Sequence, residues 1–152
     1  MKILIIGAVG SGKTTLAKKL SKQYNIKYYE IDSIVHDDSE NGKKRTQKEQ
    51  DDIIKNINEN NDWIIEGVLR KNLYYLLELS QKIIYVNISK KMRNRRIFIR
   101  FLKQVLKIEK SNYKPTFEIL KLMYKWSDDF EKQRDEFELL LKKYSDKLKI
   151  VN

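Results

Sequence analysis

Residues 2–15 read KILIIGAVGSGKTT, and this stretch decides the fold. Its first part, Lys2 to Ile6, is short, apolar and rich in β-branched side chains, which is typical of a buried parallel strand. The next part matches G-x-x-x-x-G-K-S/T, the pattern of a phosphate-binding loop. Its glycines allow backbone N–H groups to turn toward an anion, and the helix that follows adds the positive end of its dipole. We therefore expect a strand, a phosphate-binding loop and a helix, in that order.

The residue types in this loop predict which groups would hold ATP and Mg²⁺. Lys13 would reach the β and γ phosphates, and the Thr14 hydroxyl would ligate Mg²⁺. The same pattern also occurs in chains that bind no nucleotide, as a Gly-rich turn between a strand and a helix. The amphipathic helix expected after the loop, with Leu16, Ala17 and Leu20 on one face, favours the phosphate loop. The expected nucleotide-binding residues are Gly7, Gly10, Ser11, Gly12, Lys13, Thr14 and Thr15.

The length and composition indicate one domain in a reducing compartment. A chain of 152 residues fits a single P-loop domain, which we expect to span residues 1–152. Because the chain has no cysteine, disulfides, thiolate zinc sites and thiol nucleophiles are excluded. The first apolar run is too short for a signal peptide, and no stretch approaches the roughly 18 apolar residues of a membrane span. We expect a cytoplasmic protein without a membrane partner.

The charge of the chain is strongly positive. Its 32 Lys and Arg residues against 21 Asp and Glu residues give a net charge of +11. Such an excess favours anionic partners in general, including nucleotides, nucleic acid and acidic lipid. A lysine-rich surface is also a common means of solubility, so charge alone does not choose a partner.

Two acids are expected beside the phosphate loop because each lies at the end of a predicted strand. Residues 26–31 form the second predicted strand, which stops at Asp32, and residues 63–67 form the third, which ends in Glu66 and Gly67. Ligands of open parallel sheets bind at the carboxyl ends of the strands. Glu66 is therefore a candidate for Mg²⁺, and Asp32, Glu66 and Gly67 are candidates for substrate contact. Asp32 could instead cap the helix that follows.

Two arginines are candidates for contact with a second substrate. Arg70 follows the third strand and would hold a phosphate, unless it is an exposed residue of a turn. Arg45 ends a polar loop predicted at residues 33–45, just before the capping box at residues 46–49, which opens a helix to about residue 60. If that helix folds over the second substrate, Arg45 would touch the substrate. Otherwise the run of basic residues that ends in Arg45 is only solvated.

A long helix is predicted from Lys90 to Ile108, capped by Ser89 after a fourth strand at residues 82–88. It carries a predicted apolar stripe of Phe98, Phe101, Leu102 and Val105. Five cations follow at spacings of 3, 4, 3 and 4, and so line up on one face: Arg93, Arg96, Arg100, Lys103 and Lys107.

The five aligned cations suggest a site for an anion. Like charges at this spacing repel one another, so a bound anion would explain them, although a solvated face is the alternative. We expect Arg96 and Arg100 to be the catalytic arginines of this stripe.

The last part of the chain predicts a helix and a strand. The helix is expected to start after Thr116 with a break near residues 127–129, and the fifth strand is expected over residues 147–151. Met123, Phe130, Phe137 and Tyr144 recur seven residues apart along the helix and are expected to pack in the core or lid. Strands that alternate with helices predict a three-layer α/β/α sandwich with a five-stranded parallel sheet.

The chain resembles the adenylate-kinase-like P-loop kinases, and within them the DNA topology modulation proteins. The resemblance spans nearly the whole chain and rests on the loop at residues 7–14, on Asp32, and on residues 63–67 followed by Arg70. It implies the P-loop NTPase fold with strand order 2-3-1-4-5, a lid with arginines after strand four, within residues 90–116, and an acceptor held by Arg70. The third strand usually ends Asp-Gly in that superfamily, whereas Glu66 precedes Gly67 here.

These observations lead to two expectations for the function. The first is a Mg²⁺-dependent phosphotransferase that moves the γ-phosphoryl group of ATP to a small acceptor, such as a nucleoside monophosphate or a related metabolite. The second is a nucleotide-switched module that binds nucleic acid through the +11 surface and influences DNA topology.

Overall fold

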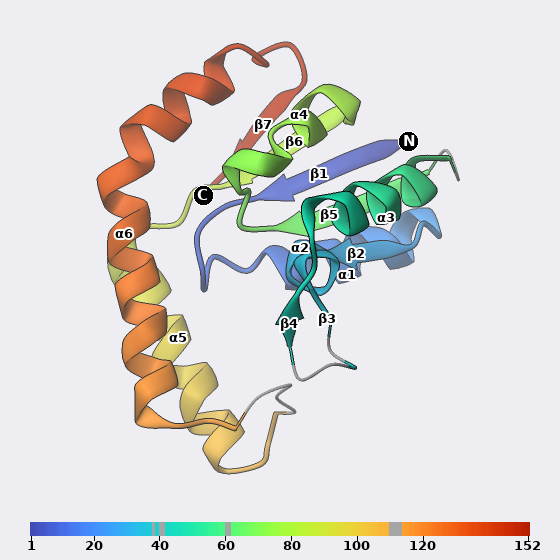
Figure 1. Cartoon of the computed structure of the whole chain (residues 1–152). Helices are drawn as coiled ribbons and strands as arrows, with labels where there is room; N and C mark the ends of the chain where they lie inside the picture. The colour runs from blue at the N-terminus through green and yellow to red at the C-terminus, as the bar shows by residue number, and fades with distance from the viewer. Residues whose placement is uncertain (38, 40–41, 60–61, 110–113) are drawn as a thin grey trace.

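A computed structural model describes all residues except 38, 40–41, 60–61 and 110–113. Its main feature is a parallel sheet of five strands in the order β2-β5-β1-β6-β7 (Figure 1). In chain order these are the second, third, first, fourth and fifth strands of the sheet, so the predicted order 2-3-1-4-5 is confirmed. The strands are β1 (Lys2–Ile6), β2 (Tyr28–Glu30), β5 (Trp63–Gly67), β6 (Lys82–Val86) and β7 (Leu148–Val151).

The helices connect these strands, as expected for parallel pairing. They are α1 (Lys13–Tyr24), α2 (Ile31–Val35), α3 (Gln47–Glu59), α4 (Tyr75–Leu79), α5 (Lys90–Val105) and α6 (Phe117–Lys142). A short 3-10 helix, η2 (Lys71–Leu73), precedes α4, and a small hairpin of β3 (His36–Asp37) and β4 (Lys43–Lys44) lies between α2 and α3. In the described part of the chain, no helix is both long and apolar enough to cross a membrane.

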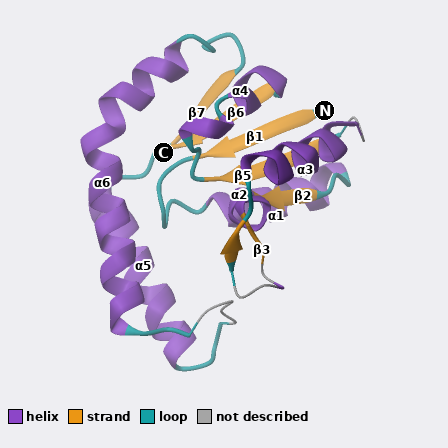
Figure 2. Ribbon diagram, viewed as in Figure 1, coloured by secondary structure: helices purple, strands orange, loops and turns teal. Residues whose placement is uncertain are grey.

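Helices cover both faces of the sheet, which gives the predicted three layers (Figure 2). Side chains of β1 alternate between the faces: Leu4 and Ile6 pack in one core with residues of α2, α3, α4 and α6. Ile3 and Ile5 pack in the other core with α1. A strand that is covered on both faces has no position for a polar side chain, which explains the continuous apolar run.

The carboxyl ends of the strands bring the expected site together at one edge. Ile6 of β1 lies beside Gly67 of β5, and Glu30 of β2 lies beside Glu66. The phosphate loop follows β1, so it starts next to Gly67 and Glu66. Figure 1 shows α5 and α6 side by side at the edge toward which β1 points.

The segment after β2 differs from the prediction. The second strand was expected over residues 26–31 and a polar loop over residues 33–45, but β2 is shorter and a helix, α2, begins at Ile31. Ile31, Ile34 and Val35 are buried at helical spacing, so a short helical turn buries all three against the sheet. Residues 38 and 40–41 of the predicted loop lie outside the described residues.

The predicted break in the last helix is wrong, because α6 is continuous. Thr116 caps it by accepting a hydrogen bond from the Ile119 N–H, and Ser127 lies buried in its middle. The expected packing of its aromatic residues is confirmed: the Phe137 ring lies 5.6 Å from the Tyr85 ring and 5.8 Å from the Phe130 ring. This long helix therefore provides both a wall of the core and a support for α5.

The predicted apolar stripe of α5 is largely wrong. Phe101 is buried, but Phe98, Leu102 and Val105 are 45%, 42% and 48% exposed. The helix is rotated so that a different face is covered, and its buried residues are Arg93, Ile97, Phe101 and Gln104. The reason is that Arg93 and Ile97 have partners on α6 and on the phosphate loop. The predicted lid at residues 90–116 includes 110–113, which lie outside the described residues.

Candidate active site

The phosphate loop is held in shape by its glycines and by α5. Gly10 and Gly12 have φ angles of 74° and 100°, which side chains other than glycine rarely adopt. A Cβ atom on Gly10 would lie 2.8 Å from the Cγ1 atom of Ile97, so the backbone of the loop packs directly against α5. The loop is therefore fixed from the side opposite the sheet.

Lys13 is buried where the phosphate loop joins α1. Its side chain donates hydrogen bonds to the Ala8 carbonyl oxygen at 2.7 Å and to the Ser11 hydroxyl at 3.5 Å. Burial lowers the pKa of Lys13 to about 8, against the opposing attraction of Glu66 and Asp32. Its hydrogen-bond partners are neutral oxygens of the loop. An anion bound in the loop would thus offer this ammonium group a better partner than it has.

Thr14 and Glu66 form a pair beside Lys13. The Thr14 hydroxyl donates a hydrogen bond of 2.5 Å to the Oε1 atom of Glu66. Burial raises the pKa of Glu66, and the nearby acids Glu30 and Asp32 raise it further, whereas Thr14 and Lys13 lower it. The strand β5 positions Glu66, because Glu66 is the residue before the last in a fully buried strand.

A magnesium ion fits the chemistry of this pair. A hydroxyl and a carboxylate oxygen are hard donors of the type that Mg²⁺ prefers, and Mg²⁺ usually combines one or two such groups with phosphates and water. Within the described residues, no three acidic or histidine side chains are grouped to hold a metal by themselves. The ion would therefore depend on the phosphates for the rest of its ligands.

Asp32 and Arg70 meet across the mouth of the site. Asp32 lies in the first turn of α2, and its Oδ1 atom accepts a hydrogen bond of 3.0 Å from the Nη2 atom of Arg70. Arg70 follows β5 by three residues, and its side chain is partly exposed. The structure thus brings together the acid after β2 and the arginine after β5.

Arg45 and Gly67 have structural partners. The Nη1 atom of Arg45 donates to the carbonyl oxygens of Ser33 and His36, both at 2.6 Å, and its Nη2 atom lies 3.2 Å from Asp37. Arg45 therefore closes the carboxyl end of α2. Gly67 packs under α2, where an added Cβ atom would lie 2.7 Å from the Cβ atom of Ile31.

Arg93 does not belong to a surface stripe. It is 1% exposed, and it donates to the Ile88 carbonyl oxygen at 2.7 Å and to Glu131 at 2.6 Å. It also donates to the Ser127 hydroxyl and carbonyl oxygen, and its guanidinium lies 5.5 Å from the Phe130 ring. These contacts fasten α5 to α6. The five predicted cations therefore do not share one environment.

Arg96 and Arg100 lie on the side of α5 that faces the loop. The Nη1 atom of Arg96 donates a hydrogen bond of 2.8 Å to the Ser11 carbonyl oxygen. Arg100 lies close enough to lower the pKa of Lys13, although burial is the main cause, and its Nη2 atom is 3.5 Å from the Met123 sulfur. Arg96 thus contacts the loop directly, and Arg100 lies near enough to affect Lys13; Arg93 also lies beside the loop, where its carbonyl oxygen would be 3.1 Å from a Cβ atom on Gly10.

Sequence reasoning missed Glu30 and the partners of Arg93. Glu30 is beside Glu66 in the register, yet it looks like an ordinary strand residue in the sequence. The sequence feature that could have identified Glu30 is its position one residue before the end of the predicted strand. Ser127 and Glu131 have no local signal, because their partner Arg93 is 34 and 38 residues away along the chain.

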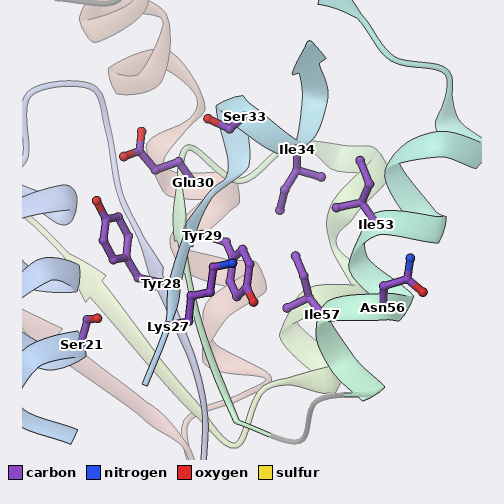
Figure 3. Close-up of a pocket in the computed structure, with 10 residues that line it drawn as sticks. All are labelled: Ser21, Lys27, Tyr28, Tyr29, Glu30, Ser33, Ile34, Ile53, Asn56 and Ile57. Carbon is purple, nitrogen blue, oxygen red and sulfur yellow. The ribbon is translucent and has the colours of Figure 1, made fainter. Parts of the chain in front are cut away.

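A hollow of about 730 Å³ lies along the outer side of the edge strand β2. Figure 3 shows Glu30 and Ser33 toward one end of it and Asn56 and Ile57 toward the other. Glu30 and Ser33 lie on either side of the exposed acid Asp32 in the sequence, so one end of the hollow lies near the carboxyl end of β2. Its lining is mainly aromatic and aliphatic: Tyr28, Tyr29, Ile34, Ile53 and Ile57.

A family model described as AAA domain matches residues 3–110. This range includes the phosphate loop, Asp32, Glu66, Arg70 and the arginines of α5. The chain belongs to the AAA domain family. A search of curated proteins gave no match.

Two solved structures share the fold of this AAA domain. One is deoxyadenosine kinase from M. mycoides with bound dATP, which is 17% identical, with a TM-score of 0.52 over 100% of this chain and 91% of that chain. The other is an uncharacterized protein from Eubacterium ventriosum, 21% identical, with a TM-score of 0.51 over 86% of this chain and 75% of that chain. At these identities, the likeness concerns the fold.

Proposed function

We propose that this protein is a Mg²⁺-dependent phosphotransferase that moves the γ-phosphoryl group of ATP to a small acceptor. The observation that carries the proposal is the buried ammonium group of Lys13, which is bonded to neutral oxygens inside a phosphate-binding loop. A buried cation is costly unless it is paired, and a triphosphate supplies the missing charge.

The comparisons agree with this proposal at the level of the fold. The deoxyadenosine kinase that shares the fold was solved with dATP bound. The sequence resemblance to adenylate-kinase-like kinases and DNA topology modulation proteins points to ATP as the donor and to a nucleoside monophosphate or related metabolite as the acceptor. The present site adds the arrangement of charges that such a reaction needs.

In the proposed reaction, the residues of this chain mainly position and neutralise phosphates. Lys13 exchanges the Ala8 carbonyl oxygen for the β and γ phosphates, and backbone N–H groups of Gly10 and Gly12 point to the same anion. Thr14 and Glu66 would hold Mg²⁺, Glu66 through water. The ion supplies further neutralisation of the phosphate charge when it is bound.

The arginines of α5 complete the donor side of the proposed site. Arg96 already touches the loop through the Ser11 carbonyl oxygen, so a small movement of α5 would bring its guanidinium to the γ phosphate. Arg100 lies one turn further along the same side. We assign the lid role to α5 and the connection that follows it, within residues 90–116.

A nucleic-acid-binding module is the alternative, and it depends on the surface charge. The +11 net charge supports it. The burial of Arg93 against Glu131 removes one cation from the stripe that would contact a nucleic-acid backbone. We therefore place the phosphotransferase first.

An acceptor screen tests the proposal. The full chain is incubated with ATP and Mg²⁺ and with each member of a panel of nucleosides, nucleotides and small hydroxyl compounds, and ADP formation is followed. The proposal expects ADP formation that one class of acceptor accelerates and that the Lys13→Ala variant lacks. ATP turnover that no acceptor changes, together with a salt-dependent shift of duplex DNA, would support the nucleic-acid module instead.

A further inference from the structure

We infer that the acceptor is an uncharged compound that reacts through a hydroxyl group, and not a phosphate ester. This inference rests on the proposed phosphotransferase function and names its substrate class. It comes from the distribution of charge around the acceptor side of the site, where Asp32, Glu30 and Glu66 lie with Arg70. The resemblance to adenylate-kinase-like kinases favoured a nucleoside monophosphate or a related metabolite, with Arg70 and Arg45 as candidate contacts.

Arg45 is not available to hold a phosphate. Its Nη1 atom donates to two carbonyl oxygens at 2.6 Å, and its Nη2 atom lies 3.2 Å from the Asp37 carboxylate. These carbonyls belong to the last turn of α2 and the residue after it, which need donors because a helix leaves them unpaired. Turning Arg45 toward a substrate would leave those oxygens and Asp37 without this partner.

Arg70 is the remaining arginine, and its charge is balanced by Asp32 at 3.0 Å. Two further carboxylates are close: Glu66, and Glu30 beside it on the neighbouring strand. Glu30 and Asp32 are near enough to Glu66 that both raise its pKa, although burial is the main cause. Arg70 is therefore paired with one of three neighbouring carboxylates. A phosphate ester would add negative charge to an edge that is already negative, whereas a neutral hydroxyl compound would not.

The hollow beside β2 suits the body of such a compound. It is about 730 Å³, which is within the usual size range of small-molecule sites. Its walls are mainly tyrosine and isoleucine side chains, and its two charged residues are of opposite sign, Lys27 and Glu30 (Figure 3). Lys27 lies 5.0 Å from the centre of the Tyr29 ring. An uncharged ring with hydroxyl groups could pack on these walls with its reacting end toward Asp32.

The transfer step is balanced without a further reactant. The acceptor hydroxyl oxygen forms a bond to the γ phosphorus of ATP as the bond from that phosphorus to the β–γ bridging oxygen breaks. The hydroxyl proton passes to the Asp32 carboxylate and then to water. The products are ADP and the phosphate ester of the acceptor. Asp32 is exposed and hydrogen-bonded to Arg70, so water can reach its carboxylate.

The test uses matched pairs of acceptors that differ by one phosphate. The full chain, ATP and Mg²⁺ are combined with each of several nucleosides or with its 5′-monophosphate, and with neutral polyhydroxyl compounds. The phosphorylated product is identified by mass spectrometry. We expect a neutral compound to be the best acceptor, with kcat/KM at least about tenfold above that of any phosphate ester in the panel.

A charge-neutral variant tests the cause of this preference. Glu30→Gln removes one negative charge while keeping the shape, and should raise kcat/KM for the phosphate ester, relative to its neutral partner, by about threefold or more. Asp52→Asn makes the same charge change on the exposed side of α3 and should leave the ratio unchanged.

Each other outcome has a defined meaning. Preference for a phosphate ester overturns the inferred substrate class while the phosphotransferase stands, and an unchanged ratio in Glu30→Gln overturns the electrostatic cause given for the preference. ATP binding that requires Lys13, without phosphorylation of any neutral compound, also overturns the substrate class. Failure of the chain to bind ATP at all removes the proposed function itself.

Discussion

Lys13 and Arg93 are two buried cations in neighbouring parts of the molecule, and they differ in their partners. Arg93 has a carboxylate, two carbonyl oxygens, a hydroxyl and an aromatic ring around its guanidinium. Lys13 has a carbonyl oxygen and a hydroxyl, and burial lowers its pKa to about 8. Both side chains are hidden from water, but the charge of Arg93 is matched by the fold and that of Lys13 is not.

This difference separates a structural cation from a functional one. Burial alone does not indicate function, since a buried arginine with a carboxylate and full hydrogen bonding is part of the packing. A buried lysine that has only neutral partners stores an unfavourable energy that an anionic ligand can release. Substitutions at the two positions should therefore affect different properties of the protein.

The largest effect is expected for Lys13→Ala. Removing the ammonium group should lower phosphotransfer by about 10³-fold, because the positive charge acts on the phosphates as they react. The melting temperature should not decrease, since folding no longer buries this charge. Turnover and melting temperature are measured on the same preparation. Turnover equal to wild type in a folded variant would show that the loop is not the ATP site.

Arg93→Ala should give the opposite result. It removes a buried cation that joins α5 to α6, and we expect a loss of roughly 3 kcal/mol in the free energy of unfolding. Arg95→Ala is the matched control: Arg95 is exposed on the same helix, so its loss should change stability by no more than about 0.5 kcal/mol. Equal stability of both variants in urea unfolding would contradict the structural role of Arg93.

Glu66→Gln tests the magnesium pair. The substitution keeps the shape and the hydrogen bond from Thr14 but removes the charge. We expect the Mg²⁺ concentration that gives half-maximal turnover to rise roughly tenfold, with a smaller change in the affinity for metal-free ATP. Asp32→Asn should also lower turnover more than it lowers metal-free ATP binding. A magnesium titration that matches wild type for both variants would place the metal elsewhere.

Arg96→Ala and Arg100→Ala test the two arginines of α5 that we propose to be catalytic. At least one of them should lower the maximal rate by about tenfold, which corresponds to roughly 1.4 kcal/mol, with little change in melting temperature. Lys103→Ala, further along α5, and Lys107→Ala, just beyond the end of α5, are controls and should not change the rate. Similar losses of DNA affinity in all four variants, with unchanged rates, would favour the nucleic-acid module.

The parts of the site that are local in sequence could be predicted. The strand, loop and helix at residues 2–24 have their signals within a few residues of one another, and so does the end of β5 at Glu66 and Gly67. The strand order also followed from the resemblance. These features depend on backbone geometry and on the burial of apolar runs. Both can be predicted from residue types that are close together in the sequence.

The environment of a charged side chain could not be predicted in the same way. The regular spacing on α5 grouped Arg93 with Arg96, but the partners of Arg93 come from a helix more than thirty residues later. Arg45 was predicted to follow a loop and to be available for a substrate. The structure has the helix α2 in that segment, and carbonyl oxygens at the end of α2 accept hydrogen bonds from the Arg45 guanidinium. In both cases, a tertiary contact decided whether a cation was free to bind a ligand.

The lowered pKa of Lys13 also predicts how stability depends on pH. Because burial lowers the pKa of Lys13 to about 8, the folded ATP-free protein loses this proton before the unfolded chain does. The free energy of unfolding should therefore rise between about pH 8 and 10.5 relative to Lys13→Ala, because the unfolded chain binds the additional proton there. ATP affinity should fall over the same range, by no more than about tenfold per pH unit.

The most direct test of the central claim is the number of protons taken up when ATP binds at pH 8.5. A pKa of about 8 leaves Lys13 mostly neutral at this pH, and a bound triphosphate would restore its proton. Calorimetry with Mg²⁺ and ATP, in two buffers of different ionisation enthalpy, measures this uptake. We predict uptake of roughly three quarters of a proton by wild type and none by Lys13→Ala. Binding without proton uptake, or equal uptake by both proteins, would contradict the claim that Lys13 is the buried cation that receives the phosphates.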